Sequence, residues 1–366
     1  MSKKIKVAVI FGGKSAEHEV SLQSAKSVIA AIDKNKYELL LIGIDKSGKW
    51  FLNDESHYLL NADNPKLIRL NNSNTEVTLV SSGEGSQLLD LQTNKPIGTI
   101  DVVFPVLHGT YGEDGSIQGL FKLMNIPFVG CGILGSSVGM DKDVTKRLLR
   151  DAGIGIAKFV IATKSNRAEI KFAEVSKELG LPMFIKPANA GSSVGVHKVS
   201  TEEEFNSALN DAFQFDRKVL VEEAVKGREI ECAVLGNENP EASIPGEIIP
   251  THTFYSYEAK YIDEHGAKLS LPAKLSEKEV KDVQQTAVKA FLAIGCEGLA
   301  RVDFFLTESG ELLINEINTM PGFTSISMYP KLWQLSGISF PELIDRLIAL
   351  ALDRHADESK LKTKFD

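Results

Sequence analysis

The segment 301–327 constrains the fold of this chain most, because its strand-like runs carry charged residues that buried strands rarely hold. Two runs rich in Val, Ile, Leu and Phe flank a turn-type cluster, Thr-Glu-Ser-Gly, at 307–310. This pattern predicts a β-hairpin. The polar residues in the two runs are Arg301, Asp303, Glu316 and Asn318.

The register of this hairpin decides which polar side chains share a face, because side chains alternate between the two faces of a strand. If the loop is 307–310, Leu306 pairs with Glu311 and Asp303 pairs with Ile314. The four polar residues then all point the same way. A loop that is one residue shorter or longer would break this parity.

Two carboxylates and an amide oxygen on one face form a cluster of hard ligands. Neighbours on one face lie about 6.6 Å apart along a strand and about 4.8 Å apart between strands, so these groups can share divalent ions. Mg²⁺ takes a few carboxylates together with phosphate oxygens and water. We therefore predict a metal site, against the alternative of a solvated sheet face with a surface ion pair.

Length and charge bound the class of protein. The 366 residues suggest about two or three domains. With 43% hydrophobic and 25% charged residues, the chain has the composition of an ordinary protein with ample core. The net charge of −8 argues against a nucleic-acid-binding surface.

The cysteines and the apolar runs indicate a compartment. Cys131, Cys232 and Cys296 are widely spaced and form neither a metal nor a disulfide pattern, which suits a reducing environment. The first apolar run is short and passes into Gly-Gly and charges, so it predicts a core strand rather than a signal peptide. No run approaches the ~20 apolar residues that span a bilayer. We expect a cytoplasmic protein with no membrane partner.

The N-terminal part alternates strands and helices. Apolar runs at 5–11, 37–44 and 101–107 predict strands, and an apolar stripe at 20–32 predicts a helix. This alternation predicts an open α/β sheet. Residues 53–95 are polar and irregular, which predicts a peripheral insertion or hairpin.

Ligands of open α/β sheets bind beyond the carboxyl ends of the strands. Glu17 and His108 follow two such ends and are candidate site residues. The alternative for Glu17 is a helix start, where its charge favours the helix dipole. The alternative for His108 is an ordinary loop histidine.

The sequence at 130–135 matches G-x-G-x-x-G but lies far from the first strand, where a dinucleotide site is expected. Asp151 has about the right offset for the acidic partner, but it follows a helix and not a strand. We interpret the motif as a tight turn between domains.

A second unit contains a lysine followed by a flap. Lys186 ends a predicted strand, and 187–196 is a run of small residues before the next strand. Backbone N–H groups of such a run can approach phosphate oxygens closely. A plain Gly-Ser hairpin loop is the alternative, and no Walker motif is present. A second lysine, Lys142, stands near the start of a predicted helix.

Three further features follow along the chain. Glu222 ends an apolar strand in an acidic pair, which suits hydrogen bonds from adenine and ribose. The segment 251–271 is long and rich in tyrosine, which predicts a lid carrying Tyr255, Tyr257, Lys260 and Tyr261. The N–H of Gly322, in the turn after the hairpin, could join Arg301 in binding an oxyanion.

Together and in this order, these features resemble the ATP-grasp superfamily and, within it, the D-alanine–D-alanine ligases. The resemblance covers nearly the whole chain. The matching motifs are GGKSAEHEVSL (12–22), HGTYGEDGSIQGL (108–120), KPANAGSSVGV (186–196), YSYEAKYI (255–262) and RVDFFL with NEINTMPGFTSIS (301–327).

The resemblance implies an α/β ATP-grasp architecture. Its N-terminal substrate-binding domain, central ATP-grasp lobe and C-terminal lobe with metal site and lid would cover 1–130, 131–220 and 221–366. It implies ligation of two D-alanines through an acylphosphate, for peptidoglycan synthesis. Alternatives are a ligase with another acceptor such as D-lactate, and a non-catalytic nucleotide sensor. Tyr261 favours D-alanine as the acceptor, because relatives that make D-alanyl-D-lactate lack this tyrosine. A cytoplasmic homodimer is also implied.

The resemblance also implies roles residue by residue. ATP would be bound by Lys142, Lys186, Ser192, Ser193, Glu222, Ala224, Val225, Glu229 and Lys260. Two Mg²⁺ ions, or Mn²⁺ as a substitute, would be held by Asp303, Glu316 and Asn318. The D-alanines would be bound by Glu17, His108, Arg301 and Ser327. Catalysis would rest on a triad of Glu17, Ser192 and Tyr261 and on the oxyanion donors Arg301 and Gly322.

Overall fold

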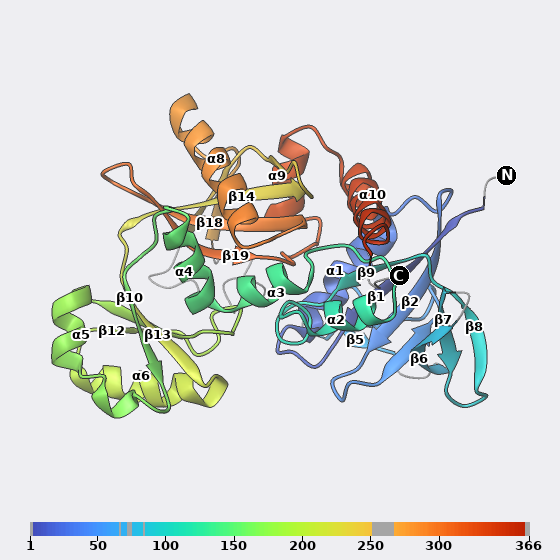
Figure 1. The fold of residues 1–366 in the computed structure, drawn as a ribbon, viewed down its shortest axis with the longest axis horizontal. Helices are drawn as coiled ribbons and strands as arrows, with labels where there is room; N and C mark the ends of the chain where they lie inside the picture. Colours follow the sequence, from blue (N-terminus) through green and yellow to red (C-terminus); the bar gives the residue numbers. More distant parts are fainter. Residues whose placement is uncertain (1–2, 66, 72–74, 83–84, 251–266, 363–366) are drawn as a thin grey trace.

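The computed structural model describes residues 3–65, 67–71, 75–82, 85–250 and 267–362. Within these residues the chain forms three main β-sheets covered by helices, with a two-stranded ribbon beside them (Figure 1). The predicted α/β class is confirmed. The three sheets lie at 5–106, 159–223 and 227–318. The division into three domains stays a prediction.

The first sheet has the strand order β8-β7-β6-β3-β2-β1-β9. The last three strands of this order are parallel, because β1 pairs in parallel with both β2 and β9, and the remaining pairs are antiparallel. The strands are β1 (Ile5–Gly12), β2 (Tyr37–Ile44), β3 (Trp50–Asn53), β6 (Thr75–Ser82), β7 (Gly85–Asp90), β8 (Lys95–Thr99) and β9 (Val102–Val106). Helix α1 (His18–Ala31) covers one face with the predicted apolar stripe, of which Leu22, Ala25 and Val28 are fully buried.

At 53–95 a peripheral insertion or hairpin was predicted, and the hairpin is confirmed, whereas the irregular character is wrong for 75–82 and 85–90. The described residues there include β6 and β7, which pair antiparallel and extend the first sheet. Val77, Leu79 and Leu88 are buried in the core of that sheet. Alternate burial on one face sustains strands even in a polar sequence. A separate ribbon pairs β4 (Leu59–Leu60) with β5 (Arg69–Leu70).

The second sheet has the order β10-β13-β11-β12. One face packs on α5 and α6 through alternating residues such as Ile185 and Val221. The residues between them in sequence, including Lys186 and Glu222, therefore point to the opposite face. The elements are β10 (Phe159–Thr163), α5 (Phe172–Leu179), β11 (Met183–Pro187), β12 (His197–Val199), α6 (Glu202–Phe215) and β13 (Lys218–Glu223).

The third sheet has the order β17-β16-β14-β18-β19, with β15 beside β14. One face packs on α8 through Ile230, Cys232 and Val302. The elements are β14 (Gly227–Gly236), β15 (Glu241–Ala242), β16 (Gly246–Pro250), β17 (Ala267–Ser270), α8 (Glu277–Ala293), β18 (Gly298–Thr307), β19 (Leu312–Asn318), α9 (Met328–Leu335) and α10 (Phe340–Glu358).

Local sequence signals start the helices of these units. Helices α6 and α8 each begin with a capping box, Thr201 with Glu204 and Ser276 with Glu279. In each box the hydroxyl and the glutamate satisfy backbone N–H groups that have no partner within the helix. Asp141 caps α4 (Lys142–Asp151) by accepting hydrogen bonds from the first turn.

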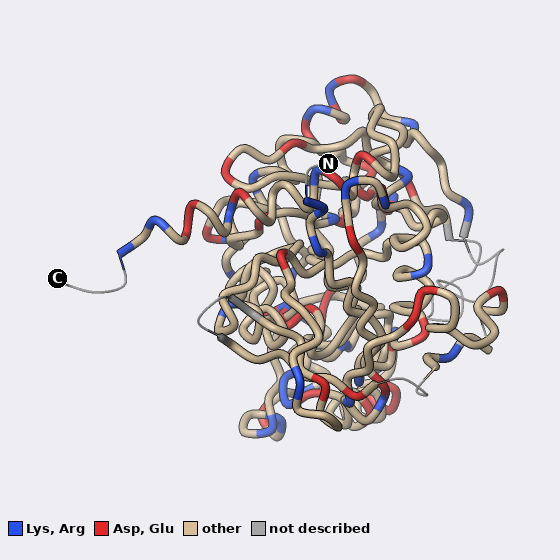
Figure 2. The backbone as a smooth tube through the Cα atoms, turned by 90° about the vertical axis from the view of Figure 1, so that its right-hand side faces the viewer, with Lys and Arg blue, Asp and Glu red and all other residues tan. Residues whose placement is uncertain are grey.

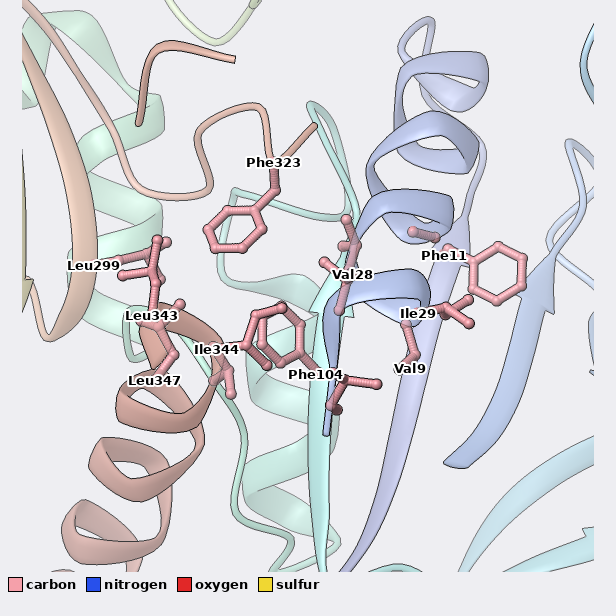
Figure 3. Close-up of a cluster of buried hydrophobic side chains, with 14 of the residues drawn as sticks. Val9, Phe11, Val28, Ile29, Phe104, Leu299, Phe323, Leu343, Ile344 and Leu347 are labelled. Atoms are coloured by element: carbon pink, nitrogen blue, oxygen red, sulfur yellow. The ribbon is translucent and has the colours of Figure 1, made fainter. Parts of the chain in front are cut away.

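A shared apolar core joins the C-terminal helices to the first sheet. Figure 3 shows Phe104 and Phe323 between α10, which contributes Leu343, and helix α1, which contributes Val28. The rings of Phe104 and Phe323 meet edge to face at 5.9 Å. The turn after β19 is therefore packed against the N-terminal sheet.

The G-x-G-x-x-G motif starts a helix and is not only a tight turn. Gly132 precedes α3 (Ile133–Met140), so the interpretation as a turn holds only for Gly130, whose φ is +103°. A Cβ on Gly135 would lie 2.5 Å from the carbonyl oxygen of Gly295. Close packing between α3 and the third unit accounts for this glycine.

Charged residues of both signs are interspersed along the chain in Figure 2. Acidic residues outnumber basic ones, which gives the net charge of −8. Among the described helices, none is long and apolar enough to cross a membrane.

Candidate active site

The polar hairpin is present, but its register differs from the predicted one. Leu306 pairs with Leu312 rather than Glu311, so the loop is 307–311. A β-bulge after Asp303 then shifts the register, and Asp303 faces Glu316 rather than Ile314. The longer loop alone would have separated the polar residues, and the bulge restores the parity. The four predicted residues therefore do share one face.

Arg301 and Asp303 form a paired contact on this face. The Arg301 Nε and Nη2 atoms donate to the two carboxylate oxygens of Asp303, each at 2.7 Å. Asn318 Nδ2 also donates to Asp303 at 2.9 Å. Arg301 Nε lies 3.0 Å from a carboxylate oxygen of Glu231, which is buried on the neighbouring strand. In this arrangement the guanidinium balances both carboxylates.

The hairpin supplies a donor set that fits Mg²⁺. It consists of two carboxylates, Asp303 and Glu316, and the amide of Asn318. In the parts of the chain that the structure describes, no group of three or more His, Cys, Asp or Glu is placed to hold a metal, and the hairpin itself offers two carboxylates and an amide. Mg²⁺ commonly uses one or two carboxylates and completes its shell with substrate phosphates and water. The three side chains therefore fill only part of a Mg²⁺ coordination shell, and the phosphates of a substrate and water would complete it.

A buried cluster of charged residues lies on the face of the second sheet opposite α5 and α6. Lys186 Nζ donates to one carboxylate oxygen of Glu222 at 2.6 Å. Lys146 Nζ lies 2.7 Å from the other oxygen. Burial alone would raise the pKa of the Glu222 carboxyl, but the two ammonium groups hold it below its ordinary value. Burial lowers the pKa of Lys146 despite the charge of Glu222.

Helix α4 brings two lysines to the space between the second and third sheets. Lys142 and Lys146 are one helical turn apart and share a face of the helix. Lys142 Nζ donates to the carbonyl oxygen of Ala190 in the flap at 2.7 Å. The same atom lies 3.8 Å from Glu316 of the polar hairpin. Lys142 therefore connects the flap to the predicted metal ligands.

The predicted adenine contacts lie where the second sheet passes into the third. Ala224 and Val225 are half-buried in the short connection between β13 and β14. Glu229 follows at the start of β14 and is half-buried as well.

The flap contacts the loop that follows β1 of the N-terminal sheet. The hydroxyl of Ser192 donates to the carboxylate of Glu17 across the gap between the two units. Glu17 is 8% exposed. Gly109, whose φ is +74°, leaves room for this carboxylate, because a Cβ there would lie 2.5 Å from Glu17 Oε2. Ser192 and Ser193 also have positive φ values of 50° and 60°, unusual for residues with a side chain.

His108 lies behind Glu17 in a buried network. Its Nε2 is 2.9 Å from the hydroxyl of Ser24, and its Nδ1 is 3.0 Å from the carbonyl oxygen of Met320. Glu113 is 3.7 Å from Nδ1. Burial alone would lower the pKa of His108, but hydrogen bonding and charge from Glu113 raise it above its ordinary value.

Ser327 and Gly322 are close together after β19. A Cβ on Gly322 would lie 3.1 Å from the hydroxyl of Ser327. That hydroxyl accepts a hydrogen bond from the N–H of Thr324 at 3.1 Å. The predicted lid residues lie outside the described residues: Tyr255, Tyr257, Lys260 and Tyr261.

Sequence reasoning missed three buried polar residues of this region. Lys146 could have been found, because it follows Lys142 by one helical turn and falls on the same face. Glu231 alternates with apolar residues on β14 and could have been noticed as a charge in a core strand. Ser24 carries no signal in the sequence that distinguishes it from other serines of α1.

This chain matches family models of D-alanine–D-alanine ligases and curated relatives with that name. A family model described as D-ala D-ala ligase N-terminus matches residues 6–131, and one described as D-ala D-ala ligase C-terminus matches residues 148–349. The D-alanine--D-alanine ligase of Oceanobacillus iheyensis is 59% identical over 360 residues, covering 98% of each chain. D-alanine--D-alanine ligase A of Escherichia coli (strain K12) is 57% identical over 361 residues, covering 99% of each.

Solved structures agree with these relatives. The D-alanine-D-alanine ligase from Coxiella burnetii matches with a TM-score of 0.86 at 40% identity, covering 98% of this chain and 97% of that one. The VanG D-Ala:D-Ser ligase from Enterococcus faecalis matches with a TM-score of 0.83 at 39% identity, covering 95% and 100%.

Proposed function

The chain belongs to the D-alanine–D-alanine ligase family, which has the ATP-grasp fold, and on that premise we propose the roles of its residues in the reaction. The chain is an ADP-forming ligase that joins two D-alanines at the expense of ATP, for peptidoglycan synthesis. Divalent metal dependence follows from the family.

One observation supports the assignment of roles most directly. Lys142 contacts the flap at Ala190 and lies near Glu316 of the hairpin. A triphosphate between the flap and the metal ligands would meet this lysine. Lys186 and the flap residues Ser192 and Ser193 are proposed to bind the phosphates with it, and Lys260 the γ-phosphate. The adenosine is assigned to Glu222, Ala224, Val225 and Glu229.

In the first step, a carboxylate oxygen of the first D-alanine attacks the γ-phosphorus of ATP, and ADP leaves. The carboxylate and the γ-phosphate are both anions, so their repulsion raises the activation barrier. Positioned cations lower this barrier. Divalent ions at Asp303, Glu316 and Asn318 would supply Lewis-acid charge neutralisation; two Mg²⁺ is our proposal, with Mn²⁺ as a substitute. Glu17 is assigned to the ammonium of the first D-alanine, with His108 nearby.

In the second step, the unprotonated amine of the second D-alanine attacks the acylphosphate carbon. A C–N bond forms and the carbonyl oxygen becomes an oxyanion. The carbonyl then re-forms as the C–O bond to phosphate breaks, and the nitrogen gives up one proton, which leaves with the phosphate as HPO4²⁻. Arg301 and the N–H of Gly322 are proposed to stabilise the oxyanion, a contact worth roughly 3–4 kcal/mol per donor. Ser327 is assigned to the second carboxylate.

Water must stay out of the site, because it hydrolyses an acylphosphate. The hydroxyl of Ser192 donates to Glu17, and we propose that this contact closes one side of the site. Tyr261 of the lid is proposed to complete this closure and to favour D-alanine over D-lactate as acceptor. The cytoplasmic location and the homodimer through the first domain also stay proposals.

The test of the proposed specificity is phosphate release from ATP with D-alanine, L-alanine or no amino acid. Of these three conditions, only D-alanine should trigger phosphate release, because Glu17 and Arg301 position the amine and the carboxylate of one enantiomer. Equal rates with both enantiomers would overturn the assignment. Product analysis with D-alanine and D-lactate together at neutral pH then reports the acceptor, and a predominant depsipeptide would contradict the role of Tyr261.

A further inference from the structure

The turn 319–323 follows the hairpin of β18 and β19, which carries the predicted metal ligands, and it contains Gly322. Under the proposed function, the N–H of Gly322 stabilises the oxyanion, so its position controls the second step. The turn belongs to the C-terminal part of the chain, yet three of its hydrogen bonds join it to the loop after β9 and to α1. Each of these contacts spans more than two hundred residues of sequence.

Hydrogen bonds hold the turn on both sides of Gly322. On the N-terminal side, His108 Nδ1 donates to the carbonyl oxygen of Met320 at 3.0 Å. On the C-terminal side, the N–H of Phe323 donates to the hydroxyl oxygen of Ser24 at 3.3 Å. Ser24 and His108 are joined to each other at 2.9 Å.

This bridge survives either charge state of the imidazole. A carbonyl oxygen only accepts, so Nδ1 of His108 carries a proton in both states. In the neutral ring, Nε2 accepts from the hydroxyl of Ser24. In the charged ring, Nε2 donates to the hydroxyl oxygen instead. Ser24 therefore remains bonded to His108 in both states, and the N–H of Phe323 has the same acceptor.

The turn is held by packing as well as by these bonds. Met320, Pro321 and Phe323 are buried, and the cavity behind the turn, of about 10 Å³, has room for one water at most. The Phe323 ring is anchored in the core, as Figure 3 shows. The polar bridge fixes the backbone on both sides of Gly322.

We propose that Ser24 is a positioning residue for the second step, which together with His108 holds the turn 320–323 so that the N–H of Gly322 points at the oxyanion. Ser24 is fully buried in α1 and touches neither predicted substrate nor predicted metal ligands. This inference rests on the proposed role of Gly322.

The test is Ser24→Ala, with Ser21→Ala as the matched control. Ser21 is equally buried one turn earlier on α1, and its hydroxyl also makes two hydrogen bonds, to the Gly12 N–H and the Val106 carbonyl. A misplacement of about 1 Å costs roughly 100-fold in rate. For Ser24→Ala we expect kcat to fall about 10- to 100-fold, with KM for ATP and for the first D-alanine within about twofold of wild type.

Rapid mixing separates the two steps. In Ser24→Ala, ADP should appear in a burst before slow dipeptide release, because acylphosphate formation does not use the oxyanion donors. Ser21→Ala should show no new burst. Ser24→Thr keeps the hydroxyl and should retain more activity than Ser24→Ala at equal thermal stability. The double variant Ser24→Ala with His108→Ala should lose little more than the worse single variant, because both act through one turn.

The outcomes distinguish this inference from the proposed function. If wild type releases no phosphate with D-alanine, the proposed function is wrong. If wild type is active and Ser24→Ala behaves like Ser21→Ala in kcat and burst, the positioning role of Ser24 is wrong while the ligase assignment stands. Additive losses in the double variant would likewise contradict a shared turn.

Discussion

The hydroxyl of Ser192 donates a hydrogen bond to the carboxylate of Glu17, joining the flap of the second sheet to the first loop of the N-terminal sheet. The two residues are 175 positions apart. A second hydroxyl, that of Ser15, donates to the carbonyl oxygen of His108 at 2.6 Å. The hydrogen bond of Ser15 thereby joins the loop after β1 to the loop after β9, and the flap contacts the first of these loops through Ser192.

Ser192→Ala removes the contact between the flap and the loop after β1. A hydrogen bond to a charged group contributes about 1.5–3 kcal/mol, so we expect kcat/KM for the first D-alanine to fall roughly 10- to 150-fold. Phosphate release at varied D-alanine measures this. Ser200→Ala, on an exposed position after the same flap, is the control. Equal losses in both variants would show that the flap does not act through Glu17.

Lys146→Met deletes one of the two ammonium groups on Glu222. Since Lys186 remains, we expect a loss of about 1–3 kcal/mol in the free energy of unfolding, measured in urea. The KM for ATP should rise, because Glu222 and Lys186 lose their fixed geometry. Lys177→Met, on an exposed position of α5, is the control. An unchanged KM would argue that the buried cluster serves folding alone.

Glu316→Gln removes a charge from the predicted metal ligands without changing the shape of the hairpin. Turnover should fall by about 100-fold or more, and Mn²⁺ affinity measured by calorimetry in the presence of ATP should weaken. The matched control is Glu311→Gln, which changes an exposed glutamate in the loop of the same hairpin. Near-normal turnover together with unchanged Mn²⁺ affinity would refute the metal assignment.

Glu247 offers a pH-dependent stability test away from the site. Arg228 donates to both of its carboxylate oxygens, at 2.8 and 2.7 Å, and lowers the pKa of Glu247 from 4.5. Because the folded pKa is the lower one, the stabilisation is present above pH 4.5 and is lost as pH falls through the folded value.

Wild type should therefore exceed Glu247→Gln in unfolding free energy at pH 7, by about 1 kcal/mol at most since Arg228 is partly exposed. The difference should close on acidification. Urea unfolding at several pH values checks this, with the exposed Glu178→Gln as control. A difference that does not depend on pH would show that the pair contributes through packing and not through charge.

Local patterns in the sequence were sufficient for most elements. The strand predicted at 37–44 matches β2, and the predicted polar residues of the hairpin are cross-strand partners in β18 and β19. These predictions rest on side-chain periodicity and turn chemistry, which are properties of neighbouring residues. The resemblance to a family then supplied roles that such patterns do not contain.

The hairpin marks the boundary of what the sequence determined by itself. The sequence showed that Arg301 and Asp303 lie on one face, as residues two apart on a strand must. Tertiary structure decided that Glu316 and Asn318 join them, because the bulge after Asp303 compensates for a loop that is longer than expected. It also decided that Glu231 pairs with Arg301, and that Ser24 and His108 hold the turn carrying Gly322. Such contacts join residues far apart in the chain, so they depend on how sheets and helices pack and not on local sequence.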